Sequence, residues 1–303
     1  MEEQEFIKIR MASIHPSFPV PFDIFVWING RHVHYLRGGD TLSASKIENF
    51  EKKAPDSFFI RIENRQDYKN YVHQQLNSDK LSPNEKALIL RESSFSLVEE
   101  LFESPDVARA LEESKAIIDQ FVSFIDEEPD SMAYLIGLSS HDFYTYTHSL
   151  DVSIYSLGLG KIASYQGDEL KELGLGALFH DIGKRHVSVE IITKTGPLDD
   201  NEWAQMQRHP TYGLKILTEH NGSENLKACC FEHHESFLGN GYPQQLSGHE
   251  IHPMARIVAI TDTYDALTTK RSYNLPMTPT DALEFMTKKL AGRYDKELLQ
   301  AMS

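Results

Sequence analysis

Cysteine is nearly absent from this chain of 303 residues, which has only two, and they are the neighbours Cys229 and Cys230. Adjacent cysteines form a disulfide only with a strained peptide, so we expect two reduced, packed thiols. A metal thiolate is the alternative, but the histidines and carboxylates of the chain already supply enough ligands. The absence of further cysteines argues against a structural zinc cage.

Basic residues and long apolar runs are also scarce. Lys and Arg total 30 against 45 Asp and Glu, which gives a net charge of −15. This charge repels polyanions, so duplex nucleic acid is not an expected partner, although a local metal cluster can still hold a small anion. No apolar run has membrane-spanning length, and residues 1–5 are acidic where a signal peptide is basic. We therefore expect a cytoplasmic protein without membrane insertion.

Residues 1–82 predict a small α/β module. Alternating apolar residues predict strands over 22–27 and 32–36, joined by a hairpin turn at Asn29-Gly30. A helix over 43–53 should end before Pro55, followed by a strand over 57–62 and a helix over 67–76. No side chains in this module suggest a reaction, so we expect a regulatory or interaction module.

Residues 83–130 predict a helical connector. Ser82-Pro83-Asn84-Glu85 is a capping box with proline at the first helical position, and a second helix is expected over 105–125. These helices are a candidate surface for a homodimer, although packing alone explains their apolar pattern. The acidic, proline-containing residues 126–130 mark a boundary.

Residues 131–303 predict helix after helix and no strand. The fold class is therefore α+β overall, with an all-α bundle preceded by the small α/β module. In the helix expected over 254–271, Asp262 and Asp265 interrupt the apolar stripe. A buried carboxylate is costly unless it is paired or bound to a metal, so Asp262 needs a partner.

Histidines and aspartates on separate helices of one bundle are the usual components of a metal site in its core. We assign one divalent metal to His148, His180, Asp181 and Asp262. A second metal is assigned to Asp181, His209, His233 and His234, so that Asp181 bridges both. Mixed nitrogen and oxygen ligands favour iron or manganese, with zinc or nickel as alternatives, over calcium.

Two such metals predict hydrolysis of a phosphodiester by a bridging hydroxide. Asp181 and Lys184 are the candidate catalytic residues, because Lys184 can neutralise the charge that develops on the phosphate. A solvated lysine at a helix end is an equally good reading of Lys184 from the sequence alone. Gly183 is expected to leave space for the phosphate.

The expected substrate rim follows the second pair of histidines. Glycine-rich turns are usually only turns, but this one comes directly after two candidate ligands. Its members Gly241, Tyr242 and Pro243 are candidate substrate contacts, and Tyr242 can stack on a base or donate to a phosphate. Arg271 and Tyr273 are further candidates for contact with guanine or phosphate.

Residues 131–303 resemble the HD-GYP family of the HD superfamily of metal-dependent phosphohydrolases. The resemblance rests on His148, Phe179-His180-Asp181-Ile182-Gly183-Lys184, residues 194–198, Glu202 with His209-Pro210, His233-His234-Glu235, residues 239–243 and residues 259–267. It implies a helical catalytic bundle and hydrolysis of cyclic di-GMP to pGpG or GMP. It also implies GGDEF-type cyclase proteins as candidate partners.

Three positions depart from the family pattern. Leu238 stands where the family usually has aspartate, Asn274 stands where a basic residue is common, and Tyr144 replaces a glutamate that brings a third metal in some members. We therefore expect two metals. The altered rim leaves two alternatives: a weakly active receptor or scaffold, or a hydrolase of another nucleotide. Single-metal enzymes do not need His209, His233 and His234, which argues against the simpler kind of hydrolase.

Overall fold

The computed structural model describes residues 5–43, 58–128, 130–138, 145–269 and 275–303. The chain forms two compact units. The first comprises residues 1–105 and 124–138, and the second comprises residues 106–123 and 139–303. Helix α4 (Val107–Glu127) has residues in both. Among the described helices, none has both the length and the hydropathy that crossing a membrane requires.

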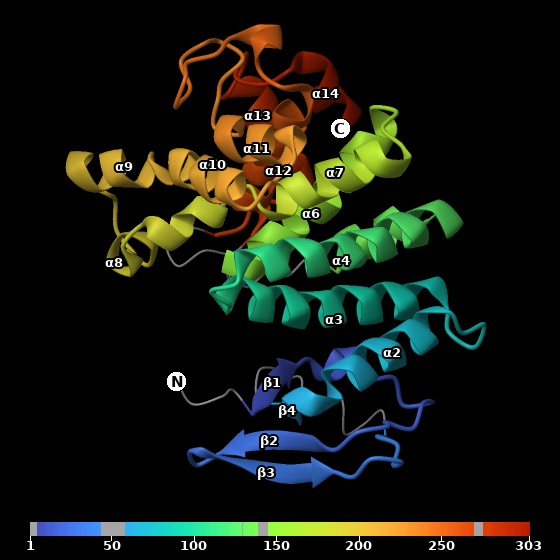
Figure 1. Cartoon of the computed structure of the whole chain (residues 1–303). Coiled ribbons are helices and arrows are strands. Elements are labelled where there is room, and N and C mark those ends of the chain that lie inside the picture. Colours follow the sequence, from blue (N-terminus) through green and yellow to red (C-terminus); the bar gives the residue numbers. More distant parts are fainter. Residues whose placement is uncertain (1–4, 44–57, 129, 139–144, 270–274) are drawn as a thin grey trace. The chain divides into compact units, whose positions relative to one another are not determined.

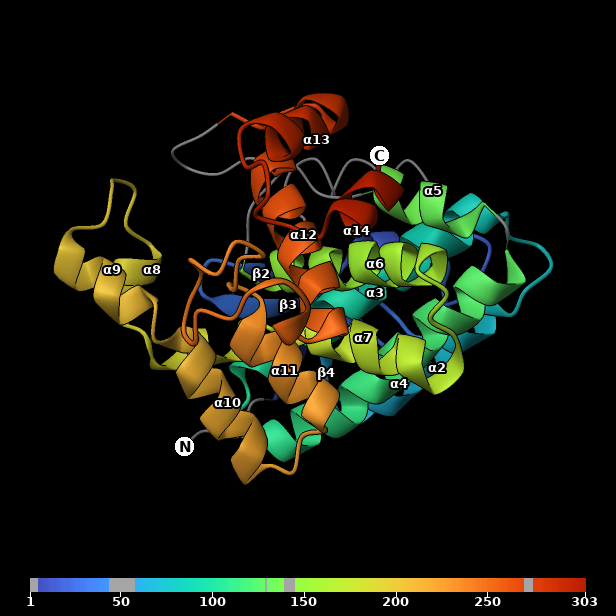
Figure 2. The same ribbon diagram turned by 90° about the horizontal axis from the view of Figure 1, so that it is seen from above.

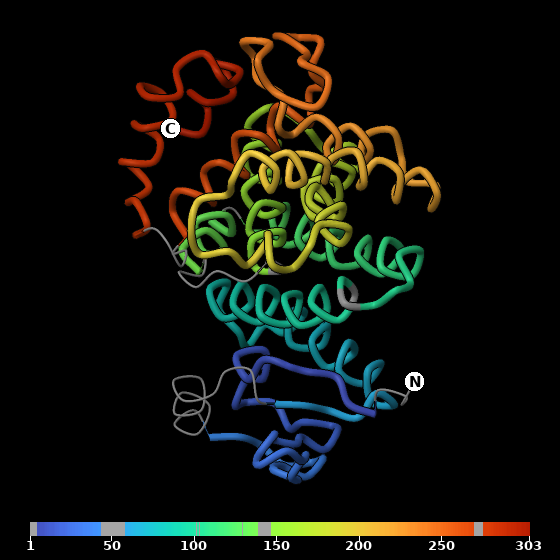
Figure 3. Tube along the Cα trace, turned by 90° about the vertical axis from the view of Figure 1, so that its left-hand side faces the viewer, coloured from blue at the N-terminus to red at the C-terminus, as the bar shows by residue number. Residues whose placement is uncertain are grey.

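The first unit contains a four-stranded antiparallel sheet in the order β1-β4-β2-β3 (Figure 1). Its strands are β1 (Phe6–Ile9), β2 (Ile24–Ile28), β3 (Arg31–Leu36) and β4 (Phe58–Arg61), drawn in blue in Figure 3. The predicted hairpin turn joins β2 to β3. Asn29 and Gly30 have positive φ angles of 50° and 79°, which a tight hairpin turn requires.

One face of this sheet forms the core of the first unit. Along β4, Phe58 and Ile60 are buried, whereas Arg61 is exposed on the opposite face. Helix α2 (Arg65–Leu76) adds the buried Tyr68 and Tyr71 to the same apolar cluster. The alternation of side chains along the strands therefore decides which face the helix covers.

Two further helices complete the first unit. Helix α3 (Pro83–Glu103) begins at the predicted capping box, where the Ser82 hydroxyl accepts from the Glu85 amide and the Glu85 carboxylate accepts from the Ser82 amide. It packs against α2 and β1, and the short helix α5 (Ser131–Gly137) packs against it.

The second unit is entirely helical among its described residues. Its helices besides α4 are α6 (Thr145–Ile162), α7 (Gly167–Leu178), α8 (Val189–Ile192), α9 (Asp200–Met206), α10 (His209–Glu219), α11 (Glu224–Glu232), α12 (Pro253–Thr268), α13 (Pro279–Lys288) and α14 (Lys296–Ala301). Helices α6, α7, α11 and α12 pack against one another in its centre, and α10 packs on α11 (Figure 2).

The predicted α+β fold class is confirmed. The sequence patterns predicted neither the edge strand β1 nor the last helix α14, which are only four and six residues long. The helix predicted over 43–53 lies almost entirely outside the described residues. The domain boundaries near residues 82 and 130 remain predictions.

Gln75 provides a test of the polar contacts in the first core. Its side-chain amide donates to the Ser13 carbonyl at 3.1 Å, and its Oε1 accepts from the His15 amide at 2.9 Å. Gln75→Leu leaves both backbone groups without these partners. We expect it to lower the free energy of unfolding by about 1–3 kcal/mol in urea denaturation.

The neighbouring Gln74 is exposed on the same helix and provides a matched control. Gln74→Leu should change the free energy of unfolding by no more than about 0.5 kcal/mol. Trp27 fluorescence, in a Trp203→Phe background, follows the unfolding of the first unit. Equal losses for the two leucine variants would contradict a structural role of the Gln75 contacts.

Candidate metal centre

Three of the predicted ligands lie at the C-terminal ends of helices. His180 follows α7, His233 follows α11, and His209, the first residue of α10, comes three residues after the end of α9. Each ring is hydrogen-bonded through Nδ1 to the carbonyl three residues before it, on Ala177 at 2.6 Å, Met206 at 2.8 Å and Cys230 at 2.9 Å. Carbonyls in the last turn of a helix lack a partner within that helix, so each imidazole satisfies one of them.

These bonds fix which ring nitrogen carries the hydrogen. A carbonyl can only accept, so Nδ1 is the donor and Nε2 of the neutral ring has a free lone pair. The Nε2 atoms of His209 and His233 lie 3.2 Å apart, and the buried Nε2 of His180 has no hydrogen-bond partner. Lone pairs at this distance repel each other unless a cation lies between them. The negative ends of the helix dipoles also favour a cation here.

The seven predicted ligands form two adjacent groups. One contains Asp181, His209, His233 and His234, and the other contains His148, His180 and Asp262; within each group the candidate ligand atoms lie within 4.8 Å of one another. The two oxygens of Asp181 face different groups. Oδ1 is 3.2 Å from His209 Nε2, whereas Oδ2 is 3.3 Å from His180 Nε2 and 3.7 Å from His148 Nε2. This is the arrangement that a bridging carboxylate needs.

The helix ends approach closely because of a glycine. Gly183 belongs to the short 3-10 helix Ile182–His186, and a Cβ atom built on it would lie 1.9 Å from the carbonyl oxygen of His209. Any other residue would push α10 away from Asp181. The structure therefore gives Gly183 a packing role between backbone segments, and the role of leaving space for a phosphate stays a prediction.

Charges in the centre are arranged to keep the carboxylates ionised. Burial alone would raise the pKa of Asp181, but Lys184 and His180 outweigh it and hold that pKa well below its usual value. Burial likewise opposes ionisation of Asp262, and the hydrogen bond from His148 outweighs it, so the pKa of Asp262 is also lowered. Burial lowers the pKa of His234 to about 3, so its ring is neutral and able to bind a metal.

Asp265 was not among the predicted site residues. It is completely buried on α12, and its Oδ2 lies 2.6 Å from His148 Nδ1, so that His148 presents Nε2 to the centre, 3.2 Å from Asp262 Oδ1. Carboxylates commonly hold metal-binding histidines in this way. Asp265 could have been found from the sequence as a second carboxylate on the apolar stripe of α12, one turn after Asp262.

The chemistry of these donors fits divalent metal ions. Buried imidazole nitrogens with free lone pairs and ionised carboxylate oxygens converge, and the Oδ1 atom of Asp181 is buried without a hydrogen-bond partner. Such atoms are costly to bury unless something binds them. Both cysteines are buried, and burial raises the pKa of each thiol. A raised pKa favours the protonated thiol over the thiolate that a metal would bind.

The loop after α11 covers the histidines. Glu235 is buried, and its carboxylate accepts from the amides of Gln244 at 2.6 Å and Leu246 at 3.1 Å, which draws the loop closed. A Cβ atom on Gly241 would lie 2.5 Å from Glu235 Cα, so the loop can fold back only with glycine there. The ring of Tyr242 then lies against His234, with centroids 4.8 Å apart, and Pro243 follows through a cis peptide bond.

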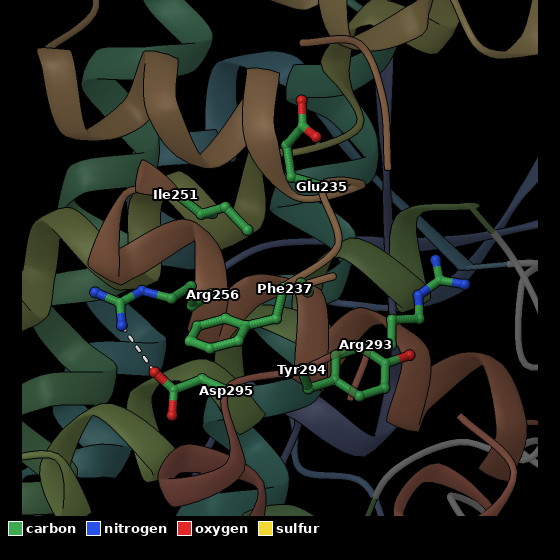
Figure 4. A pocket seen from close by; sticks show the side chains of 8 residues that line it. Glu235, Phe237, Ile251, Arg256, Arg293, Tyr294 and Asp295 are labelled. Atoms are coloured by element: carbon green, nitrogen blue, oxygen red, sulfur yellow. Dashed lines mark hydrogen bonds and ion pairs between the residues drawn. The ribbon is translucent and has the colours of Figure 1, made fainter. Parts of the chain in front are cut away.

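The beginning of the same loop is attached to the C-terminal part of the chain. The Phe237 amide donates to the Arg293 carbonyl at 2.8 Å, and Arg256 on α12 pairs with Asp295 at 2.7 Å. Figure 4 shows these side chains around a small pocket, with Phe237 between Arg256 and Tyr294. The loop that carries Tyr242 is therefore held from two sides, and no sequence pattern indicated the contact with residues 293–295.

The structure brings together only part of the predicted substrate rim. Lys184 forms an ion pair with Asp181 and is partly exposed, so it lies between the ligands and solvent. Tyr242 lies beside His234, and Pro243 follows it in the chain. Arg271 and Tyr273 lie outside the described residues, as do Tyr144 and Asn274. Leu238 is 62% exposed, so the departure from the family pattern at this position falls on the surface of the loop.

Residues 132–298 match the family model described as HD domain. The match covers more than half of the chain, so the chain belongs to the HD domain family. Within that family, the predicted resemblance to HD-GYP proteins is confirmed. An HDG"Y"P protein from Bdellovibrio bacteriovorus, Bd1817, has the same fold with a TM-score of 0.79 and 20% sequence identity, covering 98% of each chain.

Curated relatives share part of this sequence. The cyclic di-GMP phosphodiesterase PA4108 of Pseudomonas aeruginosa is 30% identical over 218 residues, which is 71% of this chain and 52% of that protein. The 3'3'-cGAMP-specific phosphodiesterase 3 of Vibrio cholerae is 35% identical over 159 residues, which is 52% of this chain and 35% of that protein. The chain thus spans about half or less of the length of these two relatives.

Replacing Asp181 tests whether it bridges the two groups. Asp181→Ala removes one donor atom from each, so we expect the purified protein to lose both metals in elemental analysis after loading with manganese or iron. Asp168→Ala, at a side chain that is 99% exposed, should keep the full complement. Retention of one metal by Asp181→Ala would show that Asp181 serves only one group.

Replacing Asp265 tests the support of His148. Asp265→Asn keeps the size of the side chain but removes the charge that orients the ring. We expect about 10–100-fold weaker metal binding, because losses of this size follow changes to carboxylates behind metal-bound histidines. Competition with a chelator measures the affinity, and Asp168→Asn is the matched control. Unchanged affinity would rule out this role.

Proposed function

We propose that this chain is a metal-dependent phosphodiesterase that hydrolyses cyclic di-GMP to pGpG or GMP. The observation that carries the proposal is the convergence of buried imidazoles and carboxylates in two adjacent groups that meet at Asp181. Curated relatives named as cyclic di-GMP phosphodiesterases support the choice of substrate.

The residues named above would hold two divalent ions, for which we propose iron or manganese, with zinc or nickel as alternatives. When bound, ions of this kind acidify a water molecule and withdraw charge from a phosphodiester. The chain supplies the remaining parts. Asp181 and Asp262 hold the positive charge in place, and Asp265 orients His148. The loop closed by Glu235 shields the ligands on one side and presents Tyr242.

Lys184 is proposed to act on the phosphate. Its ammonium group lies against Asp181, and its side chain is 27% exposed, so it can reach both the buried ligands and an entering anion. A cation at this position stabilises the extra negative charge that develops on phosphate oxygens during attack by water. Asp181 and Lys184 are thus the proposed catalytic pair.

Incubation of the metal-loaded protein with cyclic di-GMP and, separately, with 3'3'-cGAMP tests the activity. We expect linear pGpG or GMP from the first, resolved by chromatography, and removal of the metal by a chelator should abolish the product. Faster hydrolysis of 3'3'-cGAMP would assign the chain to another nucleotide. Binding of either compound without product would contradict an enzyme.

Lys184→Ala provides a test of the mechanism. We expect the variant to keep its metals and to turn over about a hundredfold more slowly, since single stabilising groups of this kind contribute rates of that order. Lys215→Ala is the control, because Lys215 is 76% exposed on α10. An unchanged turnover number for Lys184→Ala would remove this residue from the mechanism.

A receptor for a cyclic dinucleotide is the second candidate function. The observation in its favour is Leu238, an exposed apolar residue where the related family usually has aspartate. Leu238→Asp discriminates between the two candidates, since a large gain in turnover would indicate that the natural chain is tuned for binding.

The remaining parts of the proposal concern the whole chain. We propose that residues 1–82 form a regulatory or interaction module, residues 83–130 a connector that can form a homodimer, and residues 131–303 the phosphohydrolase domain. GGDEF-type cyclases are proposed as partners, and the cytoplasm as the location.

A further inference from the structure

One large aromatic side chain near the centre has no role in the site described above. Trp203 lies on α9 and is 48% exposed, an unusual exposure for tryptophan. Its ring centroid is 6.3 Å from that of Tyr242, and the two rings meet at 80°. Tyr242 in turn lies against His234, one of the candidate metal ligands.

We propose that Trp203 and Tyr242 form a binding site for one base of the cyclic dinucleotide, with the base stacked on Trp203 and its edge against Tyr242. This inference rests on the proposed function, because it names where a base of that substrate would lie. Two rings at nearly a right angle form a corner that fits a flat ring, and every nucleobase offers a face for stacking.

The order of the side chains matches the order of the groups in a nucleotide. A base is separated from its phosphate by one ribose. In the same way, the Tyr242 ring separates His234 from Trp203, because it contacts His234 on one side and Trp203 on the other. A phosphate held beside the ligands would therefore place its base next to Trp203.

The backbone that carries Trp203 is fixed before any ligand binds. Its amide donates to the Asp199 carbonyl at 2.8 Å, and Asp199 caps α9 by accepting from the amides of Asn201 and Glu202, each at 2.9 Å. The Glu202 carboxylate is paired with Lys194. Because this backbone is already ordered, stacking of a base needs to order only the side chain of Trp203.

The charges around Trp203 favour a base over a phosphate. Three acidic residues, Asp199, Asp200 and Glu202, lie within four positions of it in the chain, and Lys194 pairs with only one of them, so the group keeps a negative charge. They disfavour an anionic group at this end of the site, while a neutral aromatic ring is not repelled. The substrate would thus be oriented with its phosphates toward the candidate ligands and a base toward α9.

Kinetics of the metal-loaded protein test this site. Trp203→Ala should raise KM for cyclic di-GMP about tenfold or more, as expected for the loss of one stacked base, with kcat changed far less. Trp203→Phe should restore most of the affinity, because phenylalanine keeps a stacking face. Both variants should keep the metal content of the natural chain.

Fluorescence gives a second readout that does not need turnover. The chain has two tryptophans, Trp27 and Trp203, so Trp27→Phe leaves Trp203 as the single reporter. Cyclic di-GMP added to this metal-loaded variant in a stopped-flow instrument should quench its emission, whereas dimethyl phosphate, a diester without a base, should not. The Trp203→Phe variant, which retains Trp27, should show no quenching.

The outcomes separate the two proposals. Product without quenching, together with an unchanged KM for Trp203→Ala, would overturn the base site and leave the phosphodiesterase standing. Quenching without product would support the base site and reject hydrolysis. Absence of both would overturn both proposals.

Discussion

The second unit depends on one buried carboxylate surrounded by imidazoles. Asp181 is 5% exposed, and its two oxygens face two different sets of ring nitrogens. Burying an ionised group costs several kcal/mol unless opposite charges and hydrogen bonds compensate for it. Here Lys184 compensates for the buried charge, followed by His180. The arrangement is unfavourable as a piece of core and favourable as a holder of cations.

The helices resolve this conflict through their ends. Each of His180, His209 and His233 bonds to a carbonyl in the last turn of the helix before it, so ring position and tautomer are set where that helix ends. A ligand held in this way can rotate only if a helix end loses its cap. The short contact at Gly183 adds a second constraint, because it sets how closely two of these ends approach.

The sequence predicted the candidate metal ligands better than the residues that hold those ligands in place. The candidate ligands could be found because polar residues on apolar helices are expensive, and those of the expected ligand types could be grouped by chemistry. Asp265 and Glu235 were missed as supports because their partners, His148 and the amides of Gln244 and Leu246, become neighbours only in the folded chain. The strand β1 was missed because four residues carry too little periodicity to distinguish a strand from a loop.

The negative charge of the chain links binding of the substrate to binding of metal ions. The chain carries −15, and Asp181, Asp262 and Asp265 lie within one site, with Lys184 paired to Asp181. A cyclic dinucleotide brings two more negative charges, so these carboxylates would repel it on their own. Two divalent ions reverse the sign of the local field. Metal binding would therefore be required for substrate binding before it contributes to catalysis. The rings of Trp203 and Tyr242 differ from the rest of the proposed site, because they could select a ligand without using charge.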